Sequence, residues 1–372
     1  MAISHLPVSD HRFKRSPFFA CNDRPDTRYG IYNQRLYPLS SGYDEALHYQ
    51  HLRTYCCLYD VPETPLRING DDQIALLEKL FTRNIRKMKV GRAGYAFACN
   101  HNGGLLMDGV LMRPNAEEFI YVQGNGDFLN WAHAHADGFN AQVEDFDSWV
   151  VQIQGPTSLQ VLEAVSDIDA SAFSYYSVAE TEINGASYYV SRTGWTGERG
   201  FEIYSKGSDF DGSGLWNHLL EKGAGAHLIA SDISSMHIRR LEAGILDYGT
   251  DMDQDLNPFE IGFGHFVDFE KADFIGRAAL ASTSRKTQRV MGIRSHSAKP
   301  VRGDTLVDGS GTRVGHVSAG AWSPHLQCGI ALIRLNLGID PTTEVQLVNS
   351  EGSHRAEICA LPFIDPEKRL PR

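Results

Sequence analysis

Apolar residues between positions 64 and 146 recur with two spacings, that of a β-strand and that of an α-helix. Residues 65–68 predict a short strand, and Ile74, Leu77 and Phe81 then recur on one helical face. A second helix is predicted at residues 127–136. The other strands of this segment are predicted at residues 94–99, 105–112, 119–122 and 141–146. Together these elements predict a small α+β sheet layer.

The pattern then changes character along the chain. A strand is predicted at residues 149–154, a helix from residue 155 onward and a hairpin turn at residues 183–186. Two more helices are predicted at residues 214–222 and 231–244. From about residue 284 only short strands and turns remain, which predicts a separate β domain ending near residue 363.

The first fifty residues carry many aromatic rings among turn residues and cations. We expect this segment to dock as an arm on another domain, because a segment with so many rings usually packs onto another domain and lacks a core of its own. In the alternative interpretation, some of its rings and one cation, Lys14 or Arg15, line a pocket.

Length and charge exclude several classes of protein. The chain has 372 residues, 42% of them hydrophobic, so it can bury a substantial core and should hold two or three domains. Its formal net charge of −11 argues against a nucleic-acid partner, which requires a basic face. No run of about 18 apolar residues occurs, and residues 1–10 lack the apolar centre of a signal peptide. We therefore expect a soluble cytoplasmic protein with no membrane partner.

The metal-ligating residue types show no ligand spacing. The six cysteines are scattered without a C-x-x-C pair, so we expect free thiols. His133 and His135 are the nearest pair among fifteen histidines, yet positions two apart on a helix do not share a face. The acidic segment 248–276 does not align with a calcium loop and predicts a capped turn before a short helix. We predict no metal site.

Residues 191–204 read S-R-T-G-W-T-G-E-R-G-F-E-I-Y, with three glycines spaced three apart and Trp195 and Glu198 between them. Glycine at this density lets the backbone turn tightly and lets a planar ligand approach it closely. One interpretation is a ligand-contacting turn between two strands. The other is a glycine-rich hairpin in which Trp195 is core and Glu198 is solvated.

Asp108 is the only charge in the run L-L-M-D-G-V-L-M, an otherwise apolar strand. A carboxylate there is costly unless it is paired, hydrogen-bonded or facing a cleft. A structural and a functional role both stay open on this evidence.

Five motifs occur in order between about residues 50 and 360. They are G-W-T-G-E-R-G-F-E at 194–202, R-L-E-A-G at 240–244, D-M-D-x-x-x-N-P-F-E-I-G at 251–262, D-F-I-G-R-A-A-L at 273–280 and S-A-G-x-x-S-P at 318–324. This set resembles the folate-dependent aminomethyltransferase (glycine-cleavage T-protein) family.

The resemblance implies an α+β fold of three domains in a cloverleaf around a central cavity for tetrahydrofolate, the co-substrate. The implied folate-binding α+β domain spans residues 1–50 and 147–283. The implied ferredoxin-like α+β domain spans residues 51–146, and the implied C-terminal β-barrel-like domain spans residues 284–372.

The resemblance also implies the site residues. Asp108 is the implied active-site carboxylate near N5 of the folate. The residues implied to bind the pterin are Tyr95, Trp195, Glu198 and Arg240. Carboxylates suit the N–H donors of a pterin, and aromatic faces give it stacking area. Whether Arg239 or Arg240 faces the cavity is open, because adjacent helix positions point about 100° apart.

The N-terminal segments K-R-S-P-F-F and I-Y-N-Q-R-L-Y-P, with Met107–Asp108 in place of paired aspartates, look most like the dimethylsulfoniopropionate demethylase branch of the family. That branch implies transfer of a methyl group from a small sulfonium donor to N5, which gives 5-methyltetrahydrofolate. Rings would hold the donor's cation and a basic residue its carboxylate. The donor-binding candidates are Tyr32, Trp195 and Tyr204 for the cation, and Lys14 or Arg15 for the carboxylate.

Three alternatives accompany this interpretation. The first is aminomethyl transfer from a lipoyl carrier protein with release of ammonia, as in glycine cleavage. The second is demethylation of another betaine or of a methoxy compound. The third is a folate-binding protein without catalysis. The oligomeric state, a homodimer included, is left open by the sequence.

Overall fold

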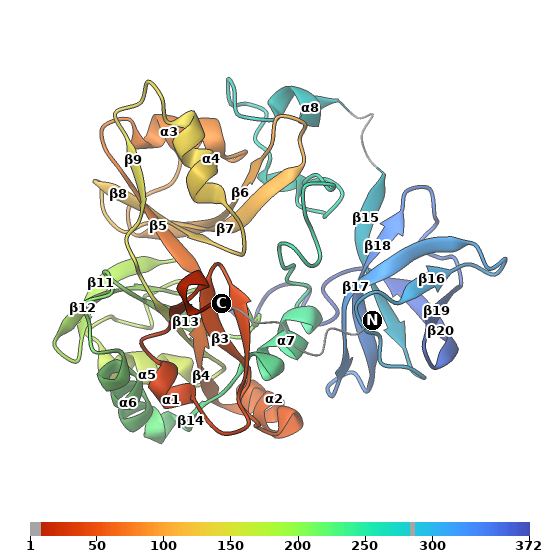
Figure 1. The fold of residues 1–372 in the computed structure, drawn as a ribbon, viewed down its shortest axis with the longest axis horizontal. Coiled ribbons are helices and arrows are strands. Elements are labelled where there is room, and N and C mark those ends of the chain that lie inside the picture. The colour runs from red at the N-terminus through yellow and green to blue at the C-terminus, as the bar shows by residue number, and fades with distance from the viewer. Residues whose placement is uncertain (1–8, 283–286) are drawn as a thin grey trace.

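The computed structural model of the protein describes residues 9–282 and 287–372. Figure 1 shows three lobes around a central region in which helix α7 (Ile233–Glu242) lies. Two lobes are built on open sheets, and the third is a closed barrel at the C-terminal end of the chain. The predicted α+β fold with a C-terminal barrel is therefore confirmed.

The first lobe is a five-stranded antiparallel sheet in the order β6-β7-β8-β5-β9. Leu66 and Ile68 of β5 pack with Leu76 and Leu80 of α3, which explains the two spacings of this segment. The spacing predicts every element here, and the structure confirms them. Their bounds are β5 Thr64–Asn69, α3 Gln73–Leu80, β6 Arg92–Cys99, β7 Leu105–Arg113, β8 Glu118–Gln123, α4 Phe128–His135 and β9 Gln142–Asp145.

The second lobe is a six-stranded sheet in the order β11-β12-β13-β10-β4-β14. Helices α5 and α6 cover one face, and α2 (Glu45–Thr54) and α7 lie against the other. The bounds of the remaining elements are β4 Cys56–Val61, β10 Val150–Gln154, α5 Ser158–Val165, β11 Val178–Ile183, β12 Ala186–Ser191, β13 Gly200–Ser205, α6 Gly212–Gly223, η2 Ala224–Ala226 and β14 Leu228–Ala230.

Strand β4 is an element that the sequence pattern does not predict. Its Cys56 and Leu58 point into the core under α5 and α6, while Cys57 and Tyr59 point to the opposite face. A strand buried on both faces reads as a continuous apolar run and gives no alternation to detect. Strand β4 falls within the range 51–146 expected for the ferredoxin-like domain, and in the structure it pairs with β10 and β14 of the six-stranded sheet. The boundary expected at residue 284 lies outside the described residues.

The N-terminal segment does dock on another lobe, but it also forms a three-stranded sheet in the order β1-β3-β2. Asn33 and Gln34 both have positive φ, as a two-residue hairpin turn requires. Phe18 inserts into the core of the six-stranded lobe, where it is 1% exposed. The bounds are η1 Asp10–Arg12, β1 Lys14–Arg15, α1 Phe19–Asn22, β2 Arg28–Tyr32 and β3 Arg35–Ser40.

The third lobe is the closed barrel β15-β18-β17-β16-β19-β20. Its interior holds Ile293, Leu306, Val317 and Ile333. The segment that leads into it holds a turn in which Asn257 Oδ1 accepts from Phe259 N and Glu260 N, followed by the short helix η3 (Gly264–Phe266), as predicted. Helix α8 (Arg277–Ala281) comes after it. The strand bounds are β15 Gln288–Ser295, β16 Thr305–Val307, β17 Arg313–Ser323, β18 Cys328–Asn336, β19 Val345–Asn349 and β20 Gly352–Cys359.

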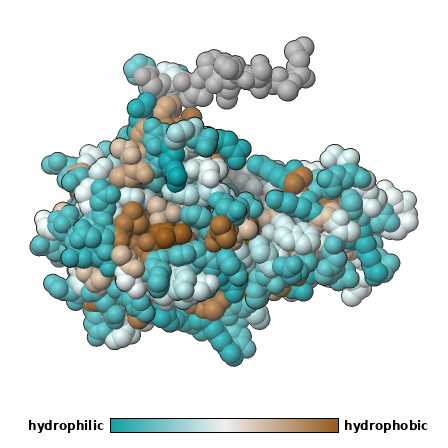
Figure 2. Space-filling view, turned by 90° about the horizontal axis from the view of Figure 1, so that it is seen from below, coloured by the Kyte–Doolittle hydropathy of each residue, from teal (hydrophilic) through white to brown (hydrophobic). Residues whose placement is uncertain are grey.

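None of the helices within residues 9–282 and 287–372 is long and apolar enough to cross a membrane. The six cysteines are free, as predicted. Figure 2 shows a face that is mostly hydrophilic, with hydrophobic residues gathered mainly on the larger body.

Candidate active site

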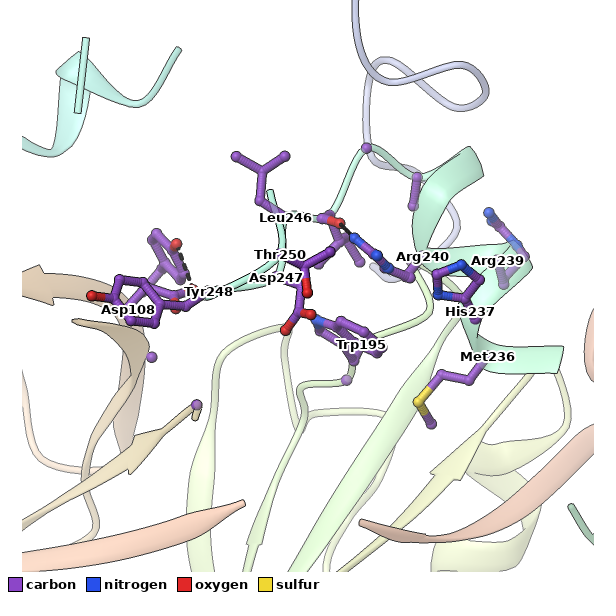
Figure 3. A pocket seen from close by; sticks show the side chains of 18 of the residues that line it. Asp108, Trp195, Met236, His237, Arg239, Arg240, Leu246, Asp247, Tyr248 and Thr250 are labelled. Carbon is purple, nitrogen blue, oxygen red and sulfur yellow. Dashed lines mark hydrogen bonds between the residues drawn. The ribbon is translucent and has the colours of Figure 1, made fainter. Parts of the chain in front are cut away.

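A cavity of about 1020 Å³ opens between the lobes. Its walls come from the N-terminal hairpin, from β7, from the glycine-rich turn before β13, from α7, and from the segment after β20. Figure 3 shows how Asp108 on one side and Trp195, Arg239 and Arg240 on the other approach this space from different lobes.

Asp108 lies in β7 on the cavity wall. The register pairs Asp108 with Phe97 and Val110 with Tyr95, so Tyr95 lies diagonally across from Asp108 on the same face. The Tyr95 hydroxyl donates to Asp108 Oδ2 over 2.8 Å. Burial raises the pKa of Asp108 to about 7; the Tyr95 hydrogen bond opposes this rise and the Asp247 carboxylate adds to it. Such a carboxylate can accept and return a proton near neutral pH.

Tyr32, at the end of β2, reaches the same place from the N-terminal hairpin. A Cβ built on Gly124 would lie 3.0 Å from the Tyr32 hydroxyl oxygen and 3.8 Å from Asp108 Oδ1. The phenol and the carboxylate therefore lie close together beside Gly124. The Tyr37 ring packs edge-on against the Tyr32 ring, with centroids 6.1 Å apart.

Two more carboxylates line this end of the cavity. Burial raises the pKa of Glu63 to about 8, with the charge of Glu202 adding to the rise. Burial also raises the pKa of Asp247, against the opposing effect of the Arg240 guanidinium. Glu63 Oε2 has no hydrogen-bond partner among the described residues. This end of the cavity is therefore acidic and aromatic.

Glu202, in β13, is the carboxylate of the glycine-rich stretch that lines the cavity. Gln152 Nε2 donates to its Oε1 over 2.5 Å, and the Tyr204 hydroxyl to its Oε2 over 2.6 Å. Thr193 Oγ1 donates to Oε2 as well. Burial raises the pKa of Glu202, and the three hydroxyls of Thr193, Tyr204 and Ser191 oppose the rise. The donors fix the carboxylate in one orientation.

Glu198, the residue predicted to hold the pterin, is placed differently. It is not part of the cavity wall, and its side chain is 2% exposed. Glu198 Oε1 lies 2.7 Å from Arg239 Nε and 2.9 Å from Arg53 Nε. Gly197, at φ +67°, turns the chain so closely onto α7 that a Cβ there would lie 2.5 Å from the Ala243 Cβ. The tight turn directs Glu198 into the interface with α2 and α7, away from the cavity in which the pterin is predicted to lie.

Both arginines left open by the sequence line the cavity. Arg240 Nη1 donates to the Asp251 carboxylate, and its guanidinium lies 5.1 Å from the centroid of the Trp195 ring. Arg239 turns toward Glu198, and neither of its Nη atoms has a hydrogen-bond partner among the described residues. The two cations thus support different parts of one wall.

Three donor-binding candidates lie outside the cavity wall. Lys14 Nζ is 2.8 Å from Asp147 Oδ1, and the Arg15 guanidinium lies over the Phe19 ring. Both stand on the short edge strand β1 with exposed side chains, so they do not reach a donor in the cavity. Tyr204 is fully buried behind Glu202, to which it donates. The structure therefore places all three side chains away from the cavity, and their contact with a donor stays a prediction.

Sequence reasoning missed Glu202, Glu63, Asp247 and Tyr37. A signal existed for Glu202, because it is the only charge in the apolar strand G-F-E-I-Y, the same feature that marked Asp108. Glu63 lies in the short connection between β4 and β5, and Asp247 lies in the irregular segment after α7, so no local pattern brings them to one cavity.

The chain matches two family profiles. The one described as GCVT N-terminal domain matches residues 37–271, and the one described as glycine cleavage T-protein C-terminal barrel domain matches residues 288–365. An aminomethyltransferase of Streptomyces coelicolor is 33% identical, over 88% of this chain and 93% of the relative. An aminomethyltransferase of a Geobacillus species is 29% identical, over 94% of this chain and 98% of the relative.

The fold has a close counterpart among solved structures. The crystal structure of glycine cleavage system aminomethyltransferase T from Bartonella henselae superposes with a TM-score of 0.85 at 23% identity, over 95% of this chain and 98% of that one. From the two profiles and the sequence relatives, this chain belongs to the glycine-cleavage T-protein family, a family of tetrahydrofolate-dependent one-carbon transferases.

Proposed function

We propose that this chain transfers an aminomethyl unit, carried on a thiol, to tetrahydrofolate at Asp108. The observation that carries the proposal is a half-buried carboxylate, oriented by Tyr95 and with a pKa raised to about 7, on the wall of the cavity between the lobes. The sequence relatives named aminomethyltransferase support the same reaction.

The residues present fit tetrahydrofolate. The cavity, at about 1020 Å³, is at the upper end of the roughly 300–1,000 Å³ typical of ligand pockets. Glu202 offers carboxylate oxygens to the N–H donors of a pterin, and Gln152 Oε1 beside it has no partner among the described residues. The Trp195 ring supplies a stacking surface on the cavity wall.

Tetrahydrofolate supplies the nitrogen nucleophile N5. In the net exchange the methylene carbon leaves sulfur and ammonia and ends bonded to N5 and N10, while the two protons of these nitrogens go to the thiolate and to ammonia. Asp108 accepts the N5 proton, directly or through water, and favours positive charge on that nitrogen. Tyr95 holds the carboxylate in place, and the walls align the two reactants.

The acidic end of the cavity suits the ammonium group of an aminomethyl donor. Glu63, Asp247 and Asp108 supply carboxyl groups there, and an ammonium beside them favours their ionised forms. Tyr32 and Tyr37 supply rings that can face a cation. Such a donor brings no carboxylate of its own, so it needs no basic partner beside these groups.

Methyl transfer from dimethylsulfoniopropionate is the second candidate. The Tyr32 and Tyr37 rings favour it, because a sulfonium is also a compact cation. Its carboxylate requires a basic partner, and Lys14 and Arg15 lie outside the cavity. Arg302 and Lys368, which do line the cavity, would have to serve instead.

One experiment separates the donors. The protein is incubated anaerobically with tetrahydrofolate and either an S-aminomethylated dihydrolipoyl carrier protein or dimethylsulfoniopropionate, and the folate products are identified by mass spectrometry. We expect 5,10-methylenetetrahydrofolate and ammonia from the first donor. Formation of 5-methyltetrahydrofolate from the second donor alone would replace the proposal with the sulfonium reaction. If neither product forms, both candidate reactions are refuted.

A further inference from the structure

Glu63 lies on the cavity wall, in the short connection between β4 and β5. Its Oε2 atom is buried and has no hydrogen-bond partner, a condition that no other aspartate or glutamate oxygen shares within residues 9–282 and 287–372. A buried acceptor without a partner is unfavourable, because its hydration is lost and nothing replaces it. The atom therefore marks a place on the wall where a hydrogen-bond donor of a ligand would be stabilised.

A structural ion pair with Arg35 does not account for this carboxyl group. Arg35 Nη1 donates to the Glu63 carbonyl over 2.8 Å and to the Ser148 carbonyl over 2.7 Å. Its guanidinium lies 4.0 Å from the centroid of the Trp149 ring. Arg35 thus fixes the backbone at residue 63 and makes no hydrogen bond to the side chain, so Glu63 is held in place with its carboxyl group unoccupied.

Aromatic rings and further carboxyl groups surround Glu63 on the cavity side. Tyr32 and Tyr37 line the same part of the wall, with ring centroids 6.1 Å apart. Burial raises the pKa of both phenols, and Asp247 and Glu63 add to the rise in each, so both rings lie near these two carboxyl groups. This arrangement suits a small cation, which the rings and the carboxyl groups can attract together.

The other three carboxyl groups of the cavity already have partners. Asp108 accepts from a tyrosine hydroxyl, Asp247 is stabilised by an arginine and a threonine, and Glu202 accepts from three side chains. Of the four groups, Glu63 is the one with a buried oxygen that receives no hydrogen bond from the described residues. It is therefore the group whose partner has to come from a ligand.

The protonation of Glu63 indicates what kind of partner this is. Burial raises its pKa to about 8, and the charge of Glu202 adds to the rise. The titratable groups that face it are Glu202 and Tyr204 of β13, Arg35 and Tyr37 of β3, Asp60 of β4 and Tyr32 of β2. A cation in the cavity favours the ionised carboxylate, which then accepts a charge-assisted hydrogen bond from any N–H of that cation.

Cations differ in whether they can donate. An ammonium group brings both a positive charge and N–H donors, so it stabilises the ionised carboxylate and occupies Oε2. A sulfonium or a quaternary ammonium brings the charge alone, and its methyl groups would cover Oε2 without donating to it. A site with a buried acceptor discriminates against the analogue that lacks the donor.

We propose that Glu63 determines the class of donor, by accepting a hydrogen bond from an N–H of the donor's cationic nitrogen. The cavity then takes a donor with a primary or secondary ammonium group and discriminates against a sulfonium or a quaternary ammonium of the same charge. That the cation belongs to a one-carbon donor rests on the proposed function. The preference for a cation with N–H groups does not.

Two probes of equal charge test this preference without turnover. They are methylthioethylammonium, which carries N–H donors, and its N,N,N-trimethyl counterpart, which carries none. Binding of each probe to the full chain is measured by titration calorimetry at pH 8. Glu63→Gln keeps an acceptor oxygen without the charge, and Glu63→Met removes both at similar length. Glu163→Gln, at an exposed carboxylate of α5 away from the cavity wall, is the matched control.

We expect the parent protein to bind the ammonium probe about 10-fold or more tightly than the trimethyl probe. Glu63→Met should bring the two affinities within about threefold of one another, and Glu63→Gln should fall between, because a neutral amide oxygen accepts a weaker hydrogen bond. Glu163→Gln should keep the preference of the parent protein. Thermal unfolding and tetrahydrofolate binding, the latter within about threefold of the parent protein, check that both Glu63 variants keep the lobes assembled.

The ammonium probe should also report the proton of Glu63. The probe stays charged between pH 6.5 and pH 8, as a simple amine does. Because binding needs the ionised carboxylate, the affinity of the parent protein should fall about 10-fold from pH 8 to pH 6.5. Glu63→Met should lose most of this dependence and keep only the smaller effect of Asp108 and Asp247. A purely structural role of Glu63 would not produce this change.

Two outcomes overturn the inference. One is equal binding of the two probes by the parent protein. The other is Glu63→Met with the preference of the parent protein intact, which would assign the preference to the rings or to the other carboxyl groups. Neither result depends on the donor assay. A preference that Glu63→Met abolishes, with no product from either donor, would sustain the Glu63 contact and refute the proposed reaction alone.

Discussion

At the scale of single residues, Asp108 is the group on which the proposed chemistry depends. Replacement by asparagine keeps the size of the side chain and an oxygen for Tyr95 to donate to, but removes the proton acceptor. We expect Asp108→Asn to lose roughly 100-fold or more in kcat and to bind tetrahydrofolate within a few-fold of the parent protein. Steady-state kinetics and calorimetry check this. Glu117→Gln, at an exposed carboxylate in the turn between β7 and β8, is the matched control. Unchanged turnover in Asp108→Asn would refute the role.

The same carboxylate predicts a pH dependence with a definite sign. Burial raises the pKa of Asp108 from 3.8 to about 7, so between these pH values the folded state holds a proton that the unfolded state has lost. Its contribution to stability is therefore present at low pH and falls as the pH rises through that window. We expect Asp108→Asn to be more stable than the parent protein by about 1–3 kcal/mol at pH 8 and equal to it near pH 4.

Denaturant unfolding of both proteins at pH 4, 6 and 8 measures this difference. Other buried carboxylates such as Asp60 and Glu63 are present in both proteins, so the comparison isolates Asp108. In the parent protein, kcat should rise as the pH passes about 7, because the proton acceptor must be ionised. A stability difference that does not change with pH would contradict the assignment.

Glu202, on the cavity wall, and Glu198, in the interface with α2 and α7, can be compared through the same Glu→Gln substitution. Glu202→Gln should weaken tetrahydrofolate binding about 10-fold or more, because a carboxylate that accepts ligand N–H groups is lost. Glu198→Gln should instead lower the free energy of unfolding by about 3 kcal/mol, because it leaves the buried Arg239 without its closest anion. Calorimetry and unfolding of both variants sort the two roles. The reverse pattern would restore Glu198 as the pterin partner.

At the scale of elements, local periodicity predicts what local packing builds. Strand β5 and helix α3 each bury one face, so Ile68 and Leu76 belong to patterns that are visible in the sequence. Helix α2 buries only Tyr49 and Leu52, and its other apolar residues, Ala46 and Leu47, are exposed, so no apolar period marks its buried face. Strand β4 is hidden for the opposite reason, because it is buried on both faces.

The residues of the site likewise divide into those that a local sequence pattern could predict and those that it could not. Asp108 and Trp195 could be predicted because each breaks a local pattern, as a charge in an apolar strand or as a ring among glycines. Glu63 and Tyr37 could not, because they reach the cavity through pairing between segments far apart in the chain. The position of Lys14 outside the cavity wall could not be predicted for the same reason, since the direction of an edge strand follows from its partner strand.

The β2–β3 hairpin predicts a selective effect on the donor. The Asn33 side chain, at its turn, donates to the Gly124 carbonyl and accepts from Gly126 N over 2.9 Å, which fixes Tyr32 and Tyr37 over the cavity. Asn33→Gly keeps the positive φ and removes only the amide. We expect the KM for the donor to rise several-fold and the affinity for tetrahydrofolate to stay unchanged. Equal losses for both substrates would show that the hairpin does not act on the donor side alone.

At the scale of the whole molecule, the cavity exists only while the barrel stays docked on the two open sheets. Glu242, at the end of α7, is the buried centre of that contact. Its carboxylate accepts from the Tyr49 hydroxyl at 2.7 and 2.9 Å and from Ser323 Oγ of the barrel at 2.6 Å. Arg53 and Arg239 lie 3.6 and 3.5 Å from Oε2. One side chain thus joins α2, α7 and β17.

Two variants separate the contribution of the Glu242 charge to stability from that of a single hydrogen bond to its carboxylate. Arg53 and Arg239 are balanced by Glu198 and Glu242, so Glu242→Gln leaves one buried positive charge in excess and should cost about 3–5 kcal/mol of stability. Ser323→Ala removes one hydrogen bond to the same carboxylate and should cost about 1–2 kcal/mol. Thermal unfolding with and without tetrahydrofolate measures both variants. Because the folate lies between lobes in the proposed complex, it should recover part of the loss in each by binding only the assembled form. Equal, small losses in the two variants would mean that the barrel is held by its apolar contacts with α7 and not by this charge network.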